Sequence, residues 1–223
     1  MLCNHGSLLM PPIFPLEIEE TILDCLTKDN EDNEGHSANS ALKTCSLVCQ
    51  AFLHICRKHI FRSIVLPVGP SATHAFEWLL CKTPEIADYI CNLDYKIWTA
   101  DLTSLSIQET LKQISRLEFL TFDQFDWPRV NWRDNLICPA LLYLLHLPTL
   151  THFKMININN FLVSDLIPCV NLKYLDIGKH TTVAAENTFP ASFPEHSIQL
   201  NKFIAGTSAS TMKLNILISV VLA

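Results

Sequence analysis

Residues 15–26 read PLEIEETILDCL, and residues 41–66 read ALKTCSLVCQAFLHICRKHIFRSIVL. In the first stretch Ile18, Ile22 and Leu26 recur at every fourth position, so they share one face of a helix, while acidic residues take the other faces. In the second stretch a further apolar set shares a helical face; it comprises Leu47, Val48, Ala51, Phe52, Ile55 and Cys56. We therefore expect two amphipathic helical segments, each of which needs a partner surface.

This pattern resembles the F-box, specifically the F-box-like modules of large fungal families, which carry P-x-E-I followed by S-L-V-C-x-A-F, C-R and H-I-F-R-x-I. The resemblance implies an F-box-like domain at residues 15–66, preceded by a tail at residues 1–14. Its apolar residues would either face a Skp-type adaptor or pack the small helical bundle, and the sequence leaves these two roles undivided. These residues are Pro15, Leu16, Ile18, Ile22, Leu26, Leu42, Val48, Cys49 and Phe52.

Two features depart from the family pattern. Phe14 precedes Pro15 where many members have leucine, and residues 27–40 (TKDNEDNEGHSANS) are longer than the usual connection. Both lower the expected affinity for the adaptor. The acidic and amide residues of this insert lack the spacing of a calcium-binding EF-hand loop, so we expect a solvated, flexible loop.

After Leu66 the sequence changes character, and Pro67, Gly69 and Pro70 mark the boundary. From there a spacing of apolar, two others, apolar, one other, apolar recurs. It covers Ile90, Leu93 and Tyr95; Leu117, Leu120 and Phe122; Leu150, Phe153 and Met155; Leu172, Leu175 and Ile177; and, more weakly, Leu200, Phe203 and Ala205. The starts lie 27, 33, 22 and 28 residues apart, close to the period of leucine-rich repeats. We expect residues 67–223 to form an irregular leucine-rich-repeat-like solenoid, with an unrelated α/β layer as the alternative.

Helical returns are expected between these strands. Ser71 is a candidate cap for a helix that buries Phe76, Leu79 and Leu80, and Ser106 opens a capping box that ends at Glu109. Pro139 suits the first turn of another helix, and Ser164 opens a third return.

An aromatic cluster follows the second repeat strand. For Phe119 and Phe122 we expect core packing. Trp127, Arg129 and Trp132 form a possible substrate-binding rim, because tryptophan and arginine are common anchors in interfaces, although the two tryptophans fit core packing equally well.

Composition excludes several classes of function. The chain is 49% hydrophobic and 17% charged, and its net charge of −6 offers no broad basic surface for nucleic acid. No export signal is evident, so its nine cysteines are expected to be reduced thiols in the cytoplasm or nucleus. Cys45, Cys49, Cys56 and His59 could share a helical face as zinc ligands, but no Cys-x-x-Cys pair occurs, and we expect neither a metal nor a cofactor. Phosphate-loop, nucleophile-elbow and metalloprotease motifs are also missing, so no catalytic residue is expected.

The C-terminal run MKLNILISVVLA at residues 212–223 is too short to span a bilayer. It is expected to form one more inner strand, without a polar cap, which suggests an incomplete C-terminus.

The resemblance implies an α+β or α/β protein, with a small helical bundle followed by an incomplete repeat solenoid. It implies a non-catalytic substrate receptor of a Skp-cullin-F-box type E3 ubiquitin ligase. The partners would be the adaptor, through it a cullin scaffold, and an unidentified protein substrate, with no nucleic acid or membrane. The alternatives are a repeat scaffold outside any ligase, a truncated product without activity and, least favoured, a small hydrolase.

Overall fold

The computed structural model describes residues 21, 36–47, 50–124, 131–184, 198 and 200–206. The chain divides into two compact units, Met1–Ile60 and Phe61–Ala223. This division lies before the expected boundary at Leu66, because Ser63–Leu66 is the first strand of a sheet in the second unit.

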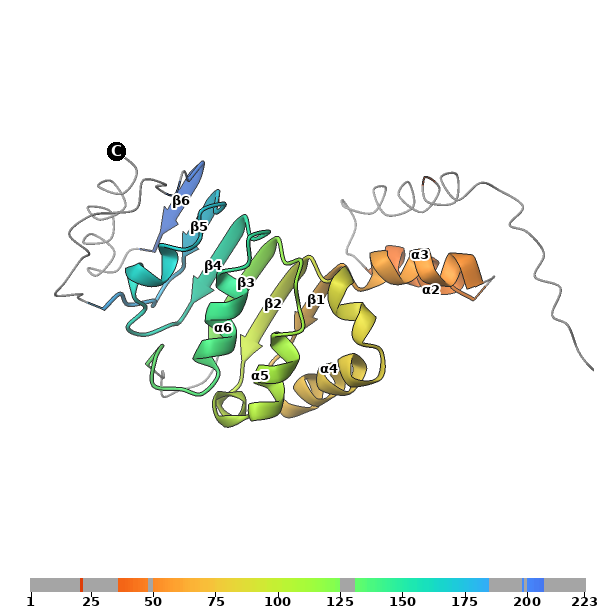
Figure 1. The fold of residues 1–223 in the computed structure, drawn as a ribbon, viewed down its shortest axis with the longest axis horizontal. Coiled ribbons are helices and arrows are strands. Elements are labelled where there is room, and N and C mark those ends of the chain that lie inside the picture. The colour runs from red at the N-terminus through yellow and green to blue at the C-terminus, as the bar shows by residue number, and fades with distance from the viewer. Residues whose placement is uncertain are drawn as a thin grey trace, which may run out of the picture. The chain divides into compact units, whose positions relative to one another are not determined.

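The described part of the first unit contains two helices, α2 (His36–Cys45) and α3 (Gln50–Ile60) (Figure 1). Leu42 of α2 packs with Ile55 and Cys56 of α3 in a small buried cluster, to which Cys45, Phe52 and Ile60 add partly buried side chains. Arg57, Lys58 and His59 occupy the last turn of α3, where positive charge suits the carbonyl end of a helix.

The expected loop at residues 27–40 is corrected in part. Helix α2 begins at His36, so the end of the insert is helical, whereas residues 27–35 lie outside the described part of the chain. The short turn after α2 is held by the Ser46 hydroxyl, which donates to the Lys43 carbonyl at 2.7 Å.

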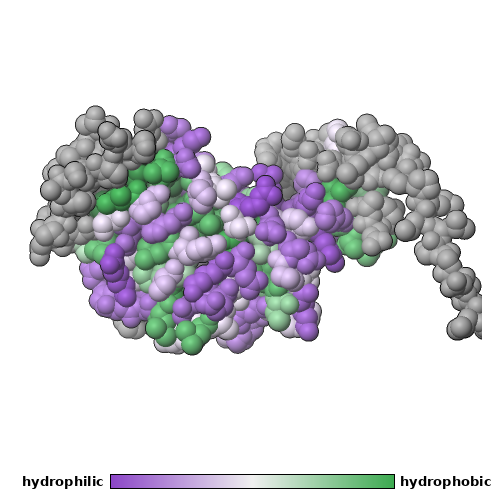
Figure 2. Space-filling view, in the orientation of Figure 1, coloured by the Kyte–Doolittle hydropathy of each residue, from purple (hydrophilic) through white to green (hydrophobic). Residues whose placement is uncertain are grey.

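The second unit is built on a parallel sheet of six strands whose spatial order follows the sequence, β1-β2-β3-β4-β5-β6. The strands are β1 (Ser63–Leu66), β2 (Asn92–Ile97), β3 (Phe119–Gln124), β4 (His152–Ile156), β5 (Tyr174–Ile177) and β6 (Lys202–Ala205). Helices α4 (Pro70–Lys82), α5 (Leu105–Leu111) and α6 (Cys138–Leu145) lie side by side along the sheet (Figure 1). In the same orientation, Figure 2 shows hydrophobic patches between hydrophilic residues on the described surface. The architecture is therefore α/β.

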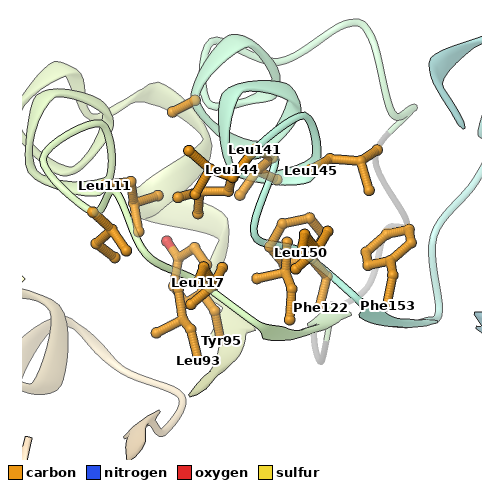
Figure 3. Packing of buried hydrophobic residues seen from close by; sticks show 14 of the residues in the cluster. Leu93, Tyr95, Leu111, Leu117, Phe122, Leu141, Leu144, Leu145, Leu150 and Phe153 are labelled. Carbon is orange, nitrogen blue, oxygen red and sulfur yellow. The ribbon is translucent and has the colours of Figure 1, made fainter. Parts of the chain in front are cut away.

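Alternate residues of the strands form two apolar columns on the inner face of the sheet. One column follows the register Ile64, Leu93, Leu120, Phe153, Leu175 and Phe203, and the other follows Leu66, Tyr95, Phe122, Met155, Ile177 and Ala205. Both columns point toward the helices, and Figure 3 shows Tyr95 and Phe122 directed at Leu111, Leu141 and Leu144. The residues of the recurring sequence pattern are thus aligned across the sheet, and β1 adds one strand before them.

A ladder of backbone hydrogen bonds precedes the strands and fixes their alignment. The carbonyl of Arg62 accepts from the amides of Cys91 and Asn92, and the carbonyl of Cys91 accepts in turn from Glu118 and Phe119. The same pair of hydrogen bonds, from two consecutive amides to one carbonyl, recurs at the carbonyls of Glu118, Thr151 and Lys173. Each strand is therefore set in register by the chain segment immediately before it.

Short 3-10 helices complete the connections: η1 (Pro84–Tyr89), η2 (Thr99–Thr103) and η3 (Val163–Leu166). Two of the expected helix caps are corrected. The cap position of α4 is Gly69 at φ 124°, with Pro70 opening the helix, so Ser71 lies inside it. The cap of α5 is Ser104, which accepts from the amide of Ile107 at 3.4 Å, in place of Ser106. Pro139 lies in the first turn of α6, as expected.

Candidate binding surface on the outer face of the sheet

The strand residues between the inner columns project to the opposite side, which we call the outer face. It comprises Asn92, Asp94 and Lys96 of β2; Phe119, Thr121 and Asp123 of β3; His152, Lys154 and Ile156 of β4; Tyr174 and Asp176 of β5; and Lys202 and Ile204 of β6. In β2 and β4 these residues are partly exposed, whereas their inner neighbours are buried. The period of two in a strand causes this alternation.

A row of stacked rings crosses the outer face. The ring of His152 lies 4.1 Å from that of Phe119, centroid to centroid, with 19° between the planes, and 5.5 Å from that of Tyr174 at 27°. The Lys202 ammonium nitrogen lies 5.5 Å from the centroid of the Tyr174 ring and closes this end of the row with a cation-π contact. Because these four residues share one register position on β3 to β6, the strand spacing itself produces the stack.

The surroundings of His152 favour the neutral form of its imidazole. Burial lowers the pKa of His152 below its ordinary value, and the nearby Lys173 ammonium lowers it further, with Glu118 acting in the opposite sense. The Nδ1 atom of His152 lies 2.9 Å from the hydroxyl oxygen of Thr151. A neutral ring between two aromatic rings favours apolar stacking over charge.

The next register positions carry charge. Lys154 and Asp176 form an ion pair at 3.4 Å across neighbouring strands. Asp123 accepts a hydrogen bond from the side-chain amide of Asn157 at 2.9 Å, and Asn157 adopts φ 60°, a conformation that asparagine tolerates better than most residues. Two of the three carboxylates on the outer face are thus satisfied within the protein.

The third carboxylate differs. The Oδ1 atoms of Asp94 and of Asn92 are shielded from solvent and have no hydrogen-bond partner in the described part of the chain. Buried polar atoms in proteins are nearly always paired, because an unpaired one loses its hydration without compensation. β2 therefore carries two unsatisfied acceptors beside the aromatic row.

Most of the residues expected in the adaptor-binding set lie outside the described residues: Pro15, Leu16, Ile18, Ile22, Leu26, Val48 and Cys49. Of the other two, Leu42 is 2% exposed and belongs to the helical cluster, and Phe52 packs against that cluster with partial exposure. Leu47, between the two helices, is 86% exposed.

Of the three residues expected to form a substrate-binding rim, the structure describes Trp132, and for this residue the expectation is corrected. Trp132 is 2% exposed and packs beside Phe122 and Phe161 with ring centroids 6.1 Å and 5.3 Å away, so it belongs to the core. Its indole Nε1 donates to the Asp165 carboxylate at 2.8 Å. Trp127 and Arg129 lie outside the described residues.

Phe119 is also corrected. It was expected in the core with Phe122, but it is 41% exposed on the outer face, whereas Phe122 is fully buried. Aligning the repeats would have revealed this, because Leu117, Leu120 and Phe122 place position 119 on the other side of the strand. The same alignment brings His152, Tyr174 and Lys202 to the position of Phe119, which the sequence reasoning missed.

Among the described residues, a serine, a glutamate and a histidine lie close together. The Glu77 carboxylate accepts from the Ser106 hydroxyl at 2.6 Å and lies 3.1 Å from Nδ1 of His74. The carboxylate thus separates the hydroxyl from the imidazole, unlike a nucleophile bonded to its base. Within the described ranges, no three histidine, cysteine or acidic side chains are grouped as metal ligands would be. Nor does that part of the chain hold a helix with the length and apolar character needed to cross a membrane.

No protein-family model matches the sequence, and neither the curated proteins nor the solved structures contain a match to the chain.

Proposed function

We propose that this chain is an F-box-like substrate receptor of a Skp-cullin-F-box type E3 ubiquitin ligase. In this proposal the N-terminal helical unit docks on a Skp-type adaptor, the sheet unit is a leucine-rich-repeat-like solenoid, and its outer face binds a protein substrate. Transfer of ubiquitin is carried out by other subunits, and the receptor works in the cytoplasm or nucleus.

One observation carries most of the weight. Strands β2 to β6 begin at intervals of about one repeat, lie in sequential order, and bury the L-x-x-L-x-L residues on one side. Repeats of this kind stack so that each unit contacts its neighbours, and together they present a continuous surface. Such a surface suits recognition of a polypeptide, and the row of rings from Phe119 to Tyr174 supplies the aromatic anchors that interfaces favour.

Support for the adaptor-binding half comes from the resemblance at residues 15–66 and from Leu47. The side chain of Leu47 is 86% exposed and therefore available to a partner, and complete burial of such a side chain contributes about 1.5–3 kcal/mol. Residue 47 adjoins Val48 and Cys49, both of which correspond to family positions for adaptor docking or bundle packing.

The test is adaptor capture by the full chain and by Leu47→Asp. Because Leu47 makes little contact within its own unit, this change leaves the helices folded, and we expect it to weaken adaptor binding at least about tenfold. Leu105→Asp is the matched control, since Leu105 is 67% exposed in the sheet unit. Failure of the unaltered chain to capture a Skp-type adaptor would reject the ligase assignment and favour a scaffold outside any ligase.

A further inference from the structure

In the described part of the chain, the row of stacked rings on the outer face is covered by a cation at one end only. At one end the Lys202 ammonium covers Tyr174, and inside the row each ring lies against the ring on the next strand. At the other end Phe119 is 41% exposed, and the register places Asn92 of β2 beside it. Neighbouring strands lie about 4.8 Å apart, so Asn92 borders the Phe119 ring on the side away from His152.

Two acceptors without donors lie at that same end. Asn92 and Asp94 are two residues apart on β2 and therefore project to the same face, and the Oδ1 atom of each has no partner in the described residues. Asp123 and Asp176 already bind Asn157 and Lys154. Lys96 also lies on β2, but no ion pair joins it to Asp94 in the part of the chain described. Both oxygens therefore lack a hydrogen-bond donor within the described residues, and a positively charged donor would also complement the Asp94 carboxylate.

We propose that Phe119, Asn92 and Asp94 form a subsite for an arginine side chain presented by the bound polypeptide. In the proposed complex the guanidinium stacks on the Phe119 ring at the end of the row that Asn92 borders. The Asn92 and Asp94 side chains rotate, so that the two oxygens, which are shielded from solvent in the free chain, accept hydrogen bonds from it. A planar guanidinium suits both contacts, because it stacks on aromatic rings and carries several directed donors, whereas the lysine ammonium is a strongly hydrated point charge. The subsite completes the row, with a cation at each end.

This inference rests on the proposed function, because it names the chemistry of the substrate segment that the outer face would bind. The probe is a five-residue alanine peptide with one central arginine, blocked at both ends and titrated into the isotope-labelled full chain. NMR chemical shifts of the Asn92 side-chain amide and the Phe119 ring report binding. Matched peptides carry citrulline, which keeps the shape without the charge, or lysine.

We expect the arginine peptide to shift both signals and to bind at least about tenfold more tightly than the citrulline peptide, since a charge-assisted hydrogen bond is lost. The lysine peptide should fall between them. Asp94→Asn and Phe119→Leu should each weaken the arginine peptide at least about tenfold. Glu109→Gln, on the exposed surface of α5, is the control and should bind as the unaltered chain does.

Equal affinity for the arginine and citrulline peptides, or unchanged binding by Asp94→Asn, would overturn the inference. Leu47→Asp separates it from the ligase assignment, because that variant should lose the adaptor and still bind the arginine peptide. If the unaltered chain binds the peptide at this subsite without capturing the adaptor, the subsite stands and the ligase assignment fails.

Discussion

Replacing Asp165 with alanine tests whether the connections that follow β3 and β4 are tied together by one buried carboxylate. Asp165 in η3 accepts from Trp132 Nε1 at 2.8 Å and from Arg133 Nη2 at 2.6 Å, both in the connection after β3. Its own backbone carbonyl lies 2.8 Å from Nε2 of His146, at the end of α6. One side chain thus joins segments more than thirty residues apart in the sequence.

The two side-chain bonds differ in environment, and this sets the expected magnitude. Trp132 and Asp165 are 2% and 6% exposed, so their charge-assisted bond contributes about 1.5–3 kcal/mol. The side chain of Arg133 is 54% exposed, and solvent screening limits that pair to about 0–1 kcal/mol. Asp165→Ala should therefore lower the free energy of unfolding by about 2–4 kcal/mol, and Arg133→Ala by less than about 1 kcal/mol.

Urea unfolding followed by tryptophan fluorescence measures this difference. All four tryptophans, at positions 78, 98, 127 and 132, belong to Phe61–Ala223, so the signal reports on the sheet unit alone. A double-mutant cycle of Trp132→Phe with Asp165→Ala isolates the buried bond. If Arg133→Ala destabilises the unit as much as Asp165→Ala, or if the cycle gives a coupling near zero, the buried bond between Trp132 and Asp165 does not tie these segments together.

Three further predictions concern the core, the imidazole and the thiols. Phe153→Ala should destabilise the sheet unit by about 3–5 kcal/mol in the same urea assay, because it opens a cavity between the sheet and the helices. His152 has a pKa below that of the unfolded chain, so protonation opposes folding, and stability should fall as the pH drops from 7 to 5; in His152→Phe this fall should be smaller. Burial raises the pKa of Cys138 to about 11 and that of Cys169 to about 12, and the Asp165 carboxylate adds to both shifts. These two thiols should therefore resist a thiol reagent until urea unfolds the unit. The thiol of the exposed Cys81 should react at once.

Each of these three predictions has an outcome that would contradict it. A loss of less than about 1 kcal/mol in Phe153→Ala would show that the site collapses or is loosely packed. An unchanged pH dependence in His152→Phe would mean that another group dominates the acid response. Cys81→Ser should remove one rapidly reacting thiol from the native count, and an unaltered count would contradict the assigned exposure.

The sequence predicted the inner half of the sheet well, because burial imposes a strict pattern there. Leu93, Leu120 and Phe153 recur at one point of the repeat, and the structure stacks them in one column. The interval between repeats varies from 22 to 33 residues, yet the register holds, because the backbone ladder before each strand fixes alignment whatever the length of the connection.

The outer face was harder to predict because no burial pattern constrains it. Phe119 is apolar and is expected in the core as part of the strand pattern, although its parity within the strand places it outside. His152 and Tyr174 become neighbours only after the strands pair, so neither their stacking nor the unpaired oxygen of Asp94 could be deduced from local sequence. The predicted cap of α5 was wrong for a related reason. Ser104 and Ser106 are both suitable cap residues, and tertiary packing decides where α5 begins.

Pairing each strand only with its neighbours in the sequence has an evolutionary consequence. Deleting or duplicating one strand with its return helix would leave every remaining strand with parallel neighbours of the same kind, so the chain can gain or lose whole units without a new topology. The side chains on the outer face are not part of the buried core that holds the strands and helices together. Selection can therefore exchange them one at a time while the framework beneath them persists.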